Sequence, residues 1–236
     1  MRDFENKSIL ITGVGREGQL GEAVAAAFAA RGARIIALDR TLANVEQRAE
    51  ALRATGADAR AFAADLTDES QIAAAAHDIA AVTGSRLDAL ITLAGGFAAS
   101  GPVRDSAPDV WTQQWQRNAV TAYLSTRAFL PMLRAAKGSI VYVASAAVLP
   151  GASVANVSAY AAAKGAVVTL MRAVAVEERG TVRANAVAPI SIRTAANLDT
   201  MGVEARYVSR EAVADAIVFL CSDEARGVTG SVLALE

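Results

Sequence analysis

The chain has 236 residues, of which 53% are hydrophobic, and a formal net charge of −1. This length suits one large domain or two small ones, and no boundary is visible, so we expect a single α/β domain over residues 1–236. Because no basic block is present, neither nucleic acid nor an anionic membrane surface is an expected partner.

Membrane insertion and metal binding are also not expected. We find no apolar run near the roughly 18 residues that a membrane span needs, and no signal-peptide pattern at the N-terminus. Cys221 is the only cysteine, which rules out an intrachain disulfide and fits a reducing compartment, so we expect a cytoplasmic protein. His77 is the only histidine and has no second ligand candidate nearby, so no metal site is expected.

Short β-type runs alternate with longer helical patterns along the whole chain. The predicted strands cover residues 8–12, 34–38, 59–64, 89–93, 140–144, 182–187 and 232–235. Six main helices are predicted. The first ends near residue 31, the second covers 42–55, and the third runs from the capping-box pattern at Asp68 to about 82. The fourth reaches about 133, the fifth ends near 179, and the sixth covers 210–220. Apolar runs without alternation indicate strands covered on both faces, hence a doubly wound parallel sheet with ligands beyond its carboxyl edge.

A glycine-rich turn follows the first predicted strand and opens the first helix. It reads Thr-Gly-Val-Gly-Arg-Glu-Gly-Gln-Leu-Gly over residues 12–21. Gly13, Gly18 and Gly21 permit a tight turn that brings backbone N–H groups close to a pyrophosphate at the helix N-terminus. The alternative is a flexible loop between strand and helix.

Asp39 ends the second predicted strand, 21 residues after Gly18 (39 − 18). This matches the roughly 20-residue spacing of the acid that binds the adenosine ribose. A carboxylate there repels a 2′-phosphate, so NAD is favoured over NADP. Arg16 or Arg40 would instead grip a 2′-phosphate, so NADP stays open as an alternative. Asp39 is otherwise a helix N-cap or turn residue.

Two further strand ends carry candidate cofactor contacts. Asp65-Leu66 follows the third strand, where it would face the adenine; a turn aspartate is the alternative. Ala94-Gly95-Gly96 follows the fourth strand and would let the cofactor pass close to the backbone. The alternative for this segment is simply the start of a loop.

Tyr160 and Lys164 are four residues apart on a predicted helix, hence on the same face. An ammonium near a phenol favours the phenolate and lowers the phenol pKa from about 10 toward neutrality. Ser145 lies just past the fifth strand at the same sheet edge, and Asn118 lies inside a helix, where asparagine is a poor helix former. A solvent-facing Tyr/Lys pair is the alternative for the two helical residues.

Taken together, these residues resemble the short-chain dehydrogenase/reductase family over essentially the whole chain. The matching segments are Thr12-Gly13 through Gly21, Asp65-Leu66, Ala94-Gly95, Asn118, Ser145, Tyr160 with Lys164, Asn185 through Pro189, Thr194, and Val228-Thr-Gly230. The resemblance implies a Rossmann-type sheet and hydride transfer between a nicotinamide and a carbonyl or alcohol. It also implies that the glycine turn, including Leu20, binds the dinucleotide.

The resemblance implies a role for each candidate catalytic residue. Tyr160 exchanges a proton with the substrate oxygen, Lys164 lowers the Tyr160 pKa and holds the nicotinamide ribose, and Ser145 donates a hydrogen bond to the substrate. Asn118 holds a water that connects Lys164 to solvent. The nicotinamide carboxamide is surrounded by Pro189, Ile192 and Thr194.

The chain departs from the family pattern in four places. The glycine turn is longer than usual, with Gln19 where a glycine is expected. Thr92-Leu93 replaces Asn-Asn, removing an amide that supports the central sheet. Ile190 follows Pro189 in place of a glycine, and the chain ends without Asp-Gly-Gly.

We therefore expect an NAD(H)-dependent oxidoreductase acting on a small or medium apolar alcohol or ketone. Its open pocket would be lined by Phe97, Val148, Leu149 and Met201. The resemblance implies a homotetramer, or a homodimer, built on the helices of Asn118 and Tyr160. The alternatives are an NADP(H)-dependent carbonyl or 3-oxoacyl reductase, and a non-catalytic nucleotide-binding protein that acts as a sensor or scaffold.

Overall fold

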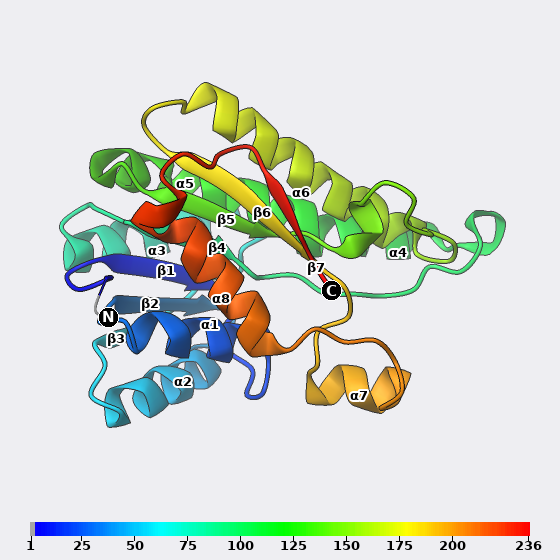
Figure 1. Ribbon diagram of the computed structural model, residues 1–236, viewed down its shortest axis with the longest axis horizontal. Coiled ribbons are helices and arrows are strands. Elements are labelled where there is room, and N and C mark those ends of the chain that lie inside the picture. The colour runs from blue at the N-terminus through cyan, green and yellow to red at the C-terminus, as the bar shows by residue number, and fades with distance from the viewer. Residues whose placement is uncertain (1–2) are drawn as a thin grey trace.

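The computed structural model describes residues 3–236, which form one seven-stranded parallel sheet with helices on both faces (Figure 1). The strands are β1 (Ser8–Thr12), β2 (Arg34–Asp39), β3 (Ala59–Ala63), β4 (Ala89–Thr92), β5 (Ser139–Val143), β6 (Arg183–Pro189) and β7 (Val232–Leu235). Their order across the sheet is β3-β2-β1-β4-β5-β6-β7. The order reverses between β1 and β4, so a ligand crevice is expected at that switch point. The predicted fold class is confirmed.

Helices cover the sheet in two layers. They are α1 (Leu20–Ala29), α2 (Leu42–Ala54), α3 (Glu69–Thr83), α4 (Pro108–Gln114), α5 (Thr121–Ala136), α6 (Ser158–Glu177), α7 (Ala195–Met201) and α8 (Arg210–Cys221). Residues of α1, α2 and α8 form one apolar cluster with one face of the sheet, and residues of α3, α5 and α6 form the other cluster. Figure 1 shows α7 apart from both layers.

Alternating side chains of the central strand β1 pack into the cores on the two faces of the sheet. In β1, Ile9 and Ile11 belong to the cluster with α1 and α8, whereas Leu10 belongs to the cluster with α3 and α5. All five β1 residues are buried, which explains why the sequence shows a continuous apolar run rather than an alternation. This packing holds the carboxyl ends of the strands at one edge.

The predicted cap of α3 is confirmed. Asp68 is the N-cap, and its Oδ1 accepts the backbone N–H groups of Ser70 and Gln71 at 2.9 and 3.1 Å. The Ser70 hydroxyl also donates to Asp68 Oδ1 at 2.7 Å, and this bond, with the backbone N–H of Gln71, lowers the pKa of Asp68 to about 2. The amide of Gln71 donates to the other Asp68 oxygen at 3.0 Å, so the turn before the helix is fixed from both sides.

Three predictions about helices were wrong. The single helix predicted to reach residue 133 is α4 and α5 joined by a π-helical segment, Trp115–Val120. The short helix α7 lies in a stretch predicted to be irregular; it is capped by Thr194, whose Oγ1 accepts the N–H of Asn197 at 3.3 Å. The third concerns membrane spans: no apolar run of that length was expected, but helix α6 is long and apolar enough, by length and composition, to cross a membrane. However, its buried residues, such as Met171, join the core beside the sheet, as in the core helix of a globular domain.

Candidate active site

Thr12 links the ends of the two central strands. Its Oγ1 accepts the backbone N–H groups of Leu93 and Ala94, both at 3.2 Å, and donates to the carbonyl of Ile91 at 3.3 Å. The next residue, Gly13, has φ +80°, and a Cβ there would lie 2.9 Å from the Ala94 nitrogen. Glycine is therefore required where the glycine turn meets the loop after β4.

Asp39 holds the glycine turn from the end of β2. Its Oδ2 accepts the N–H of Gly15 at 2.8 Å, and its Oδ1 accepts the N–H of Arg40 at 2.7 Å. A Cβ on Gly15 would lie 2.8 Å from the Asp39 carboxyl carbon. Asp39 is not the cap of α2, because Thr41 occupies that position. Each carboxylate oxygen keeps a second lone pair, so the group can still accept a ribose hydroxyl.

The glycine turn packs tightly against itself where α1 begins. A Cβ on Gly21 would lie 2.5 Å from the carbonyl oxygen of Gly13, so the backbone folds tightly on itself. Gln19, the N-cap of α1, makes no capping hydrogen bond with its side chain, and Leu20 is the first helical residue. The first N–H groups of α1 therefore remain for an anion, as a bound dinucleotide requires. Gly18 differs, since its N–H is hydrogen-bonded to Glu22 at 2.8 Å.

Asp65 and Leu66 follow β3 as predicted but carry local structural roles. The Asp65 Oδ1 accepts the N–H and the hydroxyl of Thr67 at 2.9 and 2.6 Å, and these hydrogen bonds lower the Asp65 pKa. The Leu66 side chain is buried in the core. Asp65 is thus the turn aspartate that the sequence left as an alternative, and an adenine contact stays a prediction.

Asn118 is buried in the π-helical segment and fixes the loop after β4. Its Oδ1 accepts the N–H of Gly96 at 3.3 Å, and its Nδ2 donates to the Gly96 carbonyl at 3.0 Å. The same Nδ2 donates to the Gln114 backbone carbonyl at 3.0 Å. A Cβ on Gly95 would lie 2.7 Å from Asn118 Oδ1 and 3.6 Å from Lys164 Nζ. The Ala94–Gly96 loop, Asn118 and Lys164 therefore meet at one place.

Lys164 is buried at the end of β5. Its Nζ donates to the carbonyl of Val143 at 2.7 Å and lies 5.9 Å from the centre of the Tyr160 ring. Because burial disfavours the charged ammonium, the pKa of Lys164 is lowered to about 8. The predicted placement of Tyr160 and Lys164 on one face of α6 holds, and the pair faces the sheet edge rather than solvent.

Tyr160 lies between Ser145 and Phe97. Burial raises the pKa of the Tyr160 phenol, and the nearby Ser145 hydroxyl, which lowers this pKa, has the smaller effect. The expected lowering by Lys164 is therefore not found, because desolvation of the phenolate dominates and the ammonium is directed to Val143. Phe97 meets the Tyr160 ring edge to face, with centroids 5.1 Å apart. The hydroxyl, phenol and ammonium do converge, as predicted.

Pro189, Ile192 and Thr194 lie at the end of β6 and in the segment that follows. Pro189 is buried as the last residue of β6. Ile192 forms an isolated parallel bridge with Val208, and the buried Thr194 caps α7. Among the predicted pocket residues, Phe97 and Met201 are exposed, whereas Val148 and Leu149 pack partly against the core.

One contact was missed from the sequence, and one expected loss is visible in the structure. The sequence shows Thr12 only as the start of the glycine turn, whereas in the structure its hydroxyl joins β1 to the end of β4. At Thr92, the replacement of the family asparagine is expected to remove an amide that supports the central sheet. The buried Thr92 hydroxyl has no hydrogen-bond partner among the described residues. It therefore does not replace the hydrogen bonds that the amide would make.

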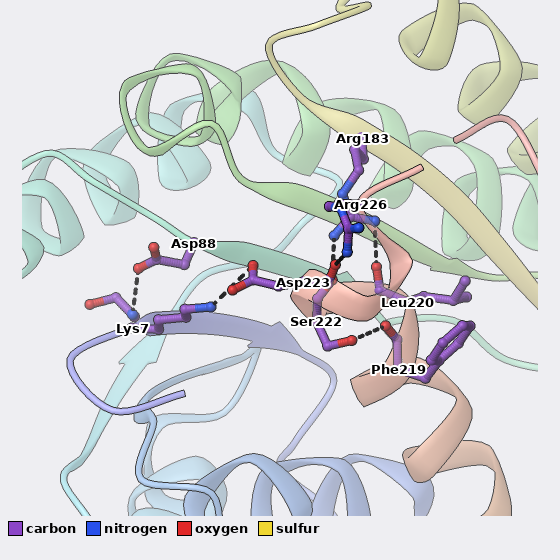
Figure 2. Close-up of polar contacts among 9 residues, drawn as sticks. Lys7, Asp88, Arg183, Phe219, Leu220, Ser222, Asp223 and Arg226 are labelled. Atoms are coloured by element: carbon purple, nitrogen blue, oxygen red, sulfur yellow. Dashed lines mark hydrogen bonds and ion pairs between the residues drawn. The ribbon is translucent and has the colours of Figure 1, made fainter. Parts of the chain in front are cut away.

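A cleft of about 520 Å³ lies at the opposite, amino edge of the sheet. Arg183 there donates to the carbonyls of Leu220 and Ser222 at 2.7 and 3.2 Å, and Lys7 pairs with Asp223 at 3.6 Å (Figure 2). Cations at helix C-termini offset the partial negative charge of the free carbonyls. Arg183 therefore satisfies the carbonyls at the C-terminus of α8, and the candidate active site lies at the carboxyl edge of the sheet.

Comparison with known proteins agrees with this geometry. Residues 13–236 match the family model described as Enoyl-(Acyl carrier protein) reductase. The 2-(S)-hydroxypropyl-CoM dehydrogenase 3 of Xanthobacter autotrophicus is 34% identical, with 99% of this chain and 96% of that protein covered. The cyclopentanol dehydrogenase of Comamonas sp. is 32% identical, with 100% and 98% covered.

Solved structures agree as well. A 3-oxoacyl-[acyl-carrier protein] reductase from Brucella melitensis with bound NAD has a TM-score of 0.86 and 30% identity, covering 99% of this chain and 90% of that one. Other similar structures hold NADP or NADPH. The chain belongs to the short-chain dehydrogenase/reductase family. Within that family it is an NAD(P)-dependent oxidoreductase related to alcohol dehydrogenases.

Proposed function

We propose that this protein transfers a hydride between NAD(H) and a small or medium apolar alcohol or ketone, with Tyr160 as the general acid and base. The observation that carries the proposal is the convergence of three groups at the carboxyl edge of the sheet. The Ser145 hydroxyl lies near enough to the Tyr160 phenol to lower its pKa, and Lys164, one helical turn from Tyr160, donates to the carbonyl of Val143. When bound, the nicotinamide supplies or accepts the hydride.

Each residue then has a physical role. Tyr160 gives its proton to the substrate oxygen during reduction and takes the hydroxyl proton during oxidation. Ser145 donates a hydrogen bond to the same oxygen, and Lys164 holds the nicotinamide ribose with its ammonium. Asn118 keeps the Ala94–Gly96 loop in place through both of its Gly96 hydrogen bonds. The water that connects Lys164 to solvent through Asn118 is part of this proposal.

The preference for NAD rests on Asp39. A carboxylate at the end of β2 accepts ribose hydroxyls and repels a 2′-phosphate. The hydrogen bond from Gly15 to Asp39 keeps this carboxylate against the glycine turn at 2.8 Å. Arg16 and Arg40 are both exposed beside it, and they are the support for NADP as the alternative cofactor.

An apolar substrate is supported by the surroundings of Tyr160. Phe97 contacts the Tyr160 ring and leaves 62% of its own surface exposed. An exposed apolar ring beside a reactive phenol favours a substrate with apolar substituents. Cyclopentanol, named for one relative, is a substrate of this kind.

Tyr160→Phe tests the function. We expect turnover of an alcohol and ketone panel, followed by nicotinamide absorbance, to fall by about 10³-fold, a typical contribution of acid–base catalysis. The dissociation constant for NADH should change less than about twofold, because the ring and its packing remain. Tyr123→Phe on α5 is the control, because it removes an exposed hydroxyl away from the site and keeps the ring on the surface of the helix. If the parent binds NADH but turns over no compound in a broad panel, the result would support the alternative of a non-catalytic nucleotide-binding protein.

Assembly and location are further parts of the proposal. Trp111, Trp115 and Tyr123 are exposed on α4, the π-helical segment and α5, and such an apolar surface favours association of chains. We propose a homotetramer, with a homodimer as the alternative, in the cytoplasm. Light scattering of the purified protein measures the assembly, and a monomer would contradict it.

A further inference from the structure

We propose that Glu22 is a positioning residue for the dinucleotide, with Arg210 and Arg48 neutralising its charge. This inference rests on the proposed cofactor site. The Glu22 Oε2 accepts the backbone N–H of Gly18 at 2.8 Å. Gly18 has φ +68°, so it is the point where the longer turn reverses direction. A side chain of α1 therefore holds the turn that leads into the same helix.

The placement of Glu22 creates an electrostatic conflict. Glu22 lies in the first turn of α1, where a carboxylate interacts favourably with the helix dipole. The same helix end is the expected pyrophosphate site, and a second negative charge there would repel the phosphates. An uncompensated Glu22 would therefore shape the turn and weaken dinucleotide binding at the same time.

Two arginines from other helices resolve this conflict. Arg48 Nη1 lies 3.2 Å from Glu22 Oε1, and Arg210 Nη1 lies 3.6 Å from Glu22 Oε2. Arg48 is buried and also pairs with Glu17 at 3.3 Å. Neutralised in this way, the carboxylate can keep its hydrogen bond to Gly18 without presenting a full charge to the phosphates.

Arg210 brings a distant part of the chain to the glycine turn. It is the first residue of α8, which packs beside α1, and it follows the segment that carries Ile192 and Thr194. Its Nη1 would lie 3.9 Å from a Cβ on Gly18. The guanidinium is thus close enough to act on Glu22, and equally close enough to act on a phosphate directly, so the experiment must separate the two.

The experiment measures the NADH dissociation constant by fluorescence titration in single and double variants. Glu22→Ala removes the acceptor for Gly18 and should raise the constant about tenfold, whereas Glu22→Gln keeps an acceptor and should stay within about twofold of the parent. Arg210→Gln exposes the Glu22 charge and should raise the constant about threefold to tenfold. In the Glu22→Gln background, Arg210→Gln should leave the dissociation constant almost unchanged, because residue 22 then carries no charge for Arg210 to neutralise.

The controls make each outcome decisive. Glu211→Gln removes a carboxylate that also pairs with Arg210, at 3.5 Å, but does not lie on the turn, and it should bind like the parent. Melting temperatures without NADH check that every variant folds, and kcat at saturating cofactor should stay within about twofold because the chemistry is untouched.

Two results would overturn the inference. One is an unchanged dissociation constant in folded Glu22→Ala. The other is an equal effect of Arg210→Gln in both backgrounds, which would mean that Arg210 binds the dinucleotide directly. A parent that binds no NADH overturns the cofactor proposal and this inference together, whereas the first two results leave the proposed function standing.

Discussion

The ammonium of Lys164 donates a hydrogen bond to the backbone carbonyl of Val143 at 2.7 Å, and Val143 lies two residues before Ser145 in the chain. Since Lys164 and Tyr160 share one face of α6, this bond sets the distance between the helix and the end of β5. It therefore helps to hold the Tyr160 phenol within reach of the Ser145 hydroxyl. The bond also keeps a cation buried, which has a measurable effect on stability.

Lys164→Met should change how stability depends on pH. The unfolded chain keeps the Lys164 proton up to the ordinary pKa of 10.5, whereas the native protein releases it near 8. Between these values the unfolded state binds more protons, so the Lys164 contribution to the free energy of unfolding rises with pH, by on the order of 3 kcal/mol. Denaturant unfolding of parent and variant from pH 7 to 10 measures it.

The comparison of the two proteins isolates Lys164 from other groups. Burial raises the pKa of Cys221 from 9.0 to about 12, which lowers stability as pH rises above 9, but this residue is present in both proteins and cancels. We expect the stability difference between parent and variant to move in favour of the parent as pH rises. A difference that stays constant over the range would show that the ammonium is not disfavoured by burial.

Gly95→Ala should damage the site, and its neighbour provides the control. A Cβ at Gly95 would lie 2.7 Å from Asn118 Oδ1, while one at Gly96 would meet only Arg117 Cδ, at 3.9 Å. The buried Asn118 would have to shift, moving the loop and the surroundings of Lys164. We expect kcat/KM to fall about 100-fold in Gly95→Ala and to fall much less in Gly96→Ala. Equal activities for the two variants would contradict this geometry.

Asp39→Asn should weaken the discrimination between the two nicotinamide cofactors. The substitution removes the charge that repels a 2′-phosphate, and we expect the ratio of kcat/KM for NAD to that for NADP to fall about tenfold or more. The amide can accept only one of the two backbone hydrogen bonds, so the melting temperature is measured alongside. A parent that prefers NADP, with a preference that Arg40→Ala abolishes, would overturn the choice of NAD.

Arg183→Met should destabilise the fold without touching the site. The Arg183 guanidinium donates to the carbonyls of Leu220 and Ser222 at the end of α8 (Figure 2). Losing charge-assisted bonds to two carbonyls should lower the free energy of unfolding by about 2 kcal/mol. Arg226→Met is the matched control, since Arg226 is exposed and its contact to the Asp223 carbonyl is long, at 3.4 Å. Similar losses in both variants would contradict the assignment.

Most strands and helices of this protein could be predicted from the sequence, because the patterns that mark them lie within a few neighbouring residues. Apolar runs without alternation marked the buried parallel strands, and β1 and β7 were predicted with the bounds that the structure has. The spacing of Tyr160 and Lys164 placed both on one helical face, and Asp68 with Gln71 marked the start of α3. Each of these patterns lies within one element, so neighbouring residues suffice to read it.

Other features depend on residues far apart in the chain. The π-helical turn brings Asn118 to Gly96, 22 positions away, and Thr12 reaches Ala94, 82 positions away. The direction of the Tyr160 pKa shift was predicted wrongly, because burial is a property of the packed protein and outweighs a neighbouring charge. Arg210 meets Glu22 only because α8 packs beside α1. The periodicity of a sequence shows which residues share one face of a helix or strand. Which other element packs against that face is decided only when the helices and strands assemble around the sheet.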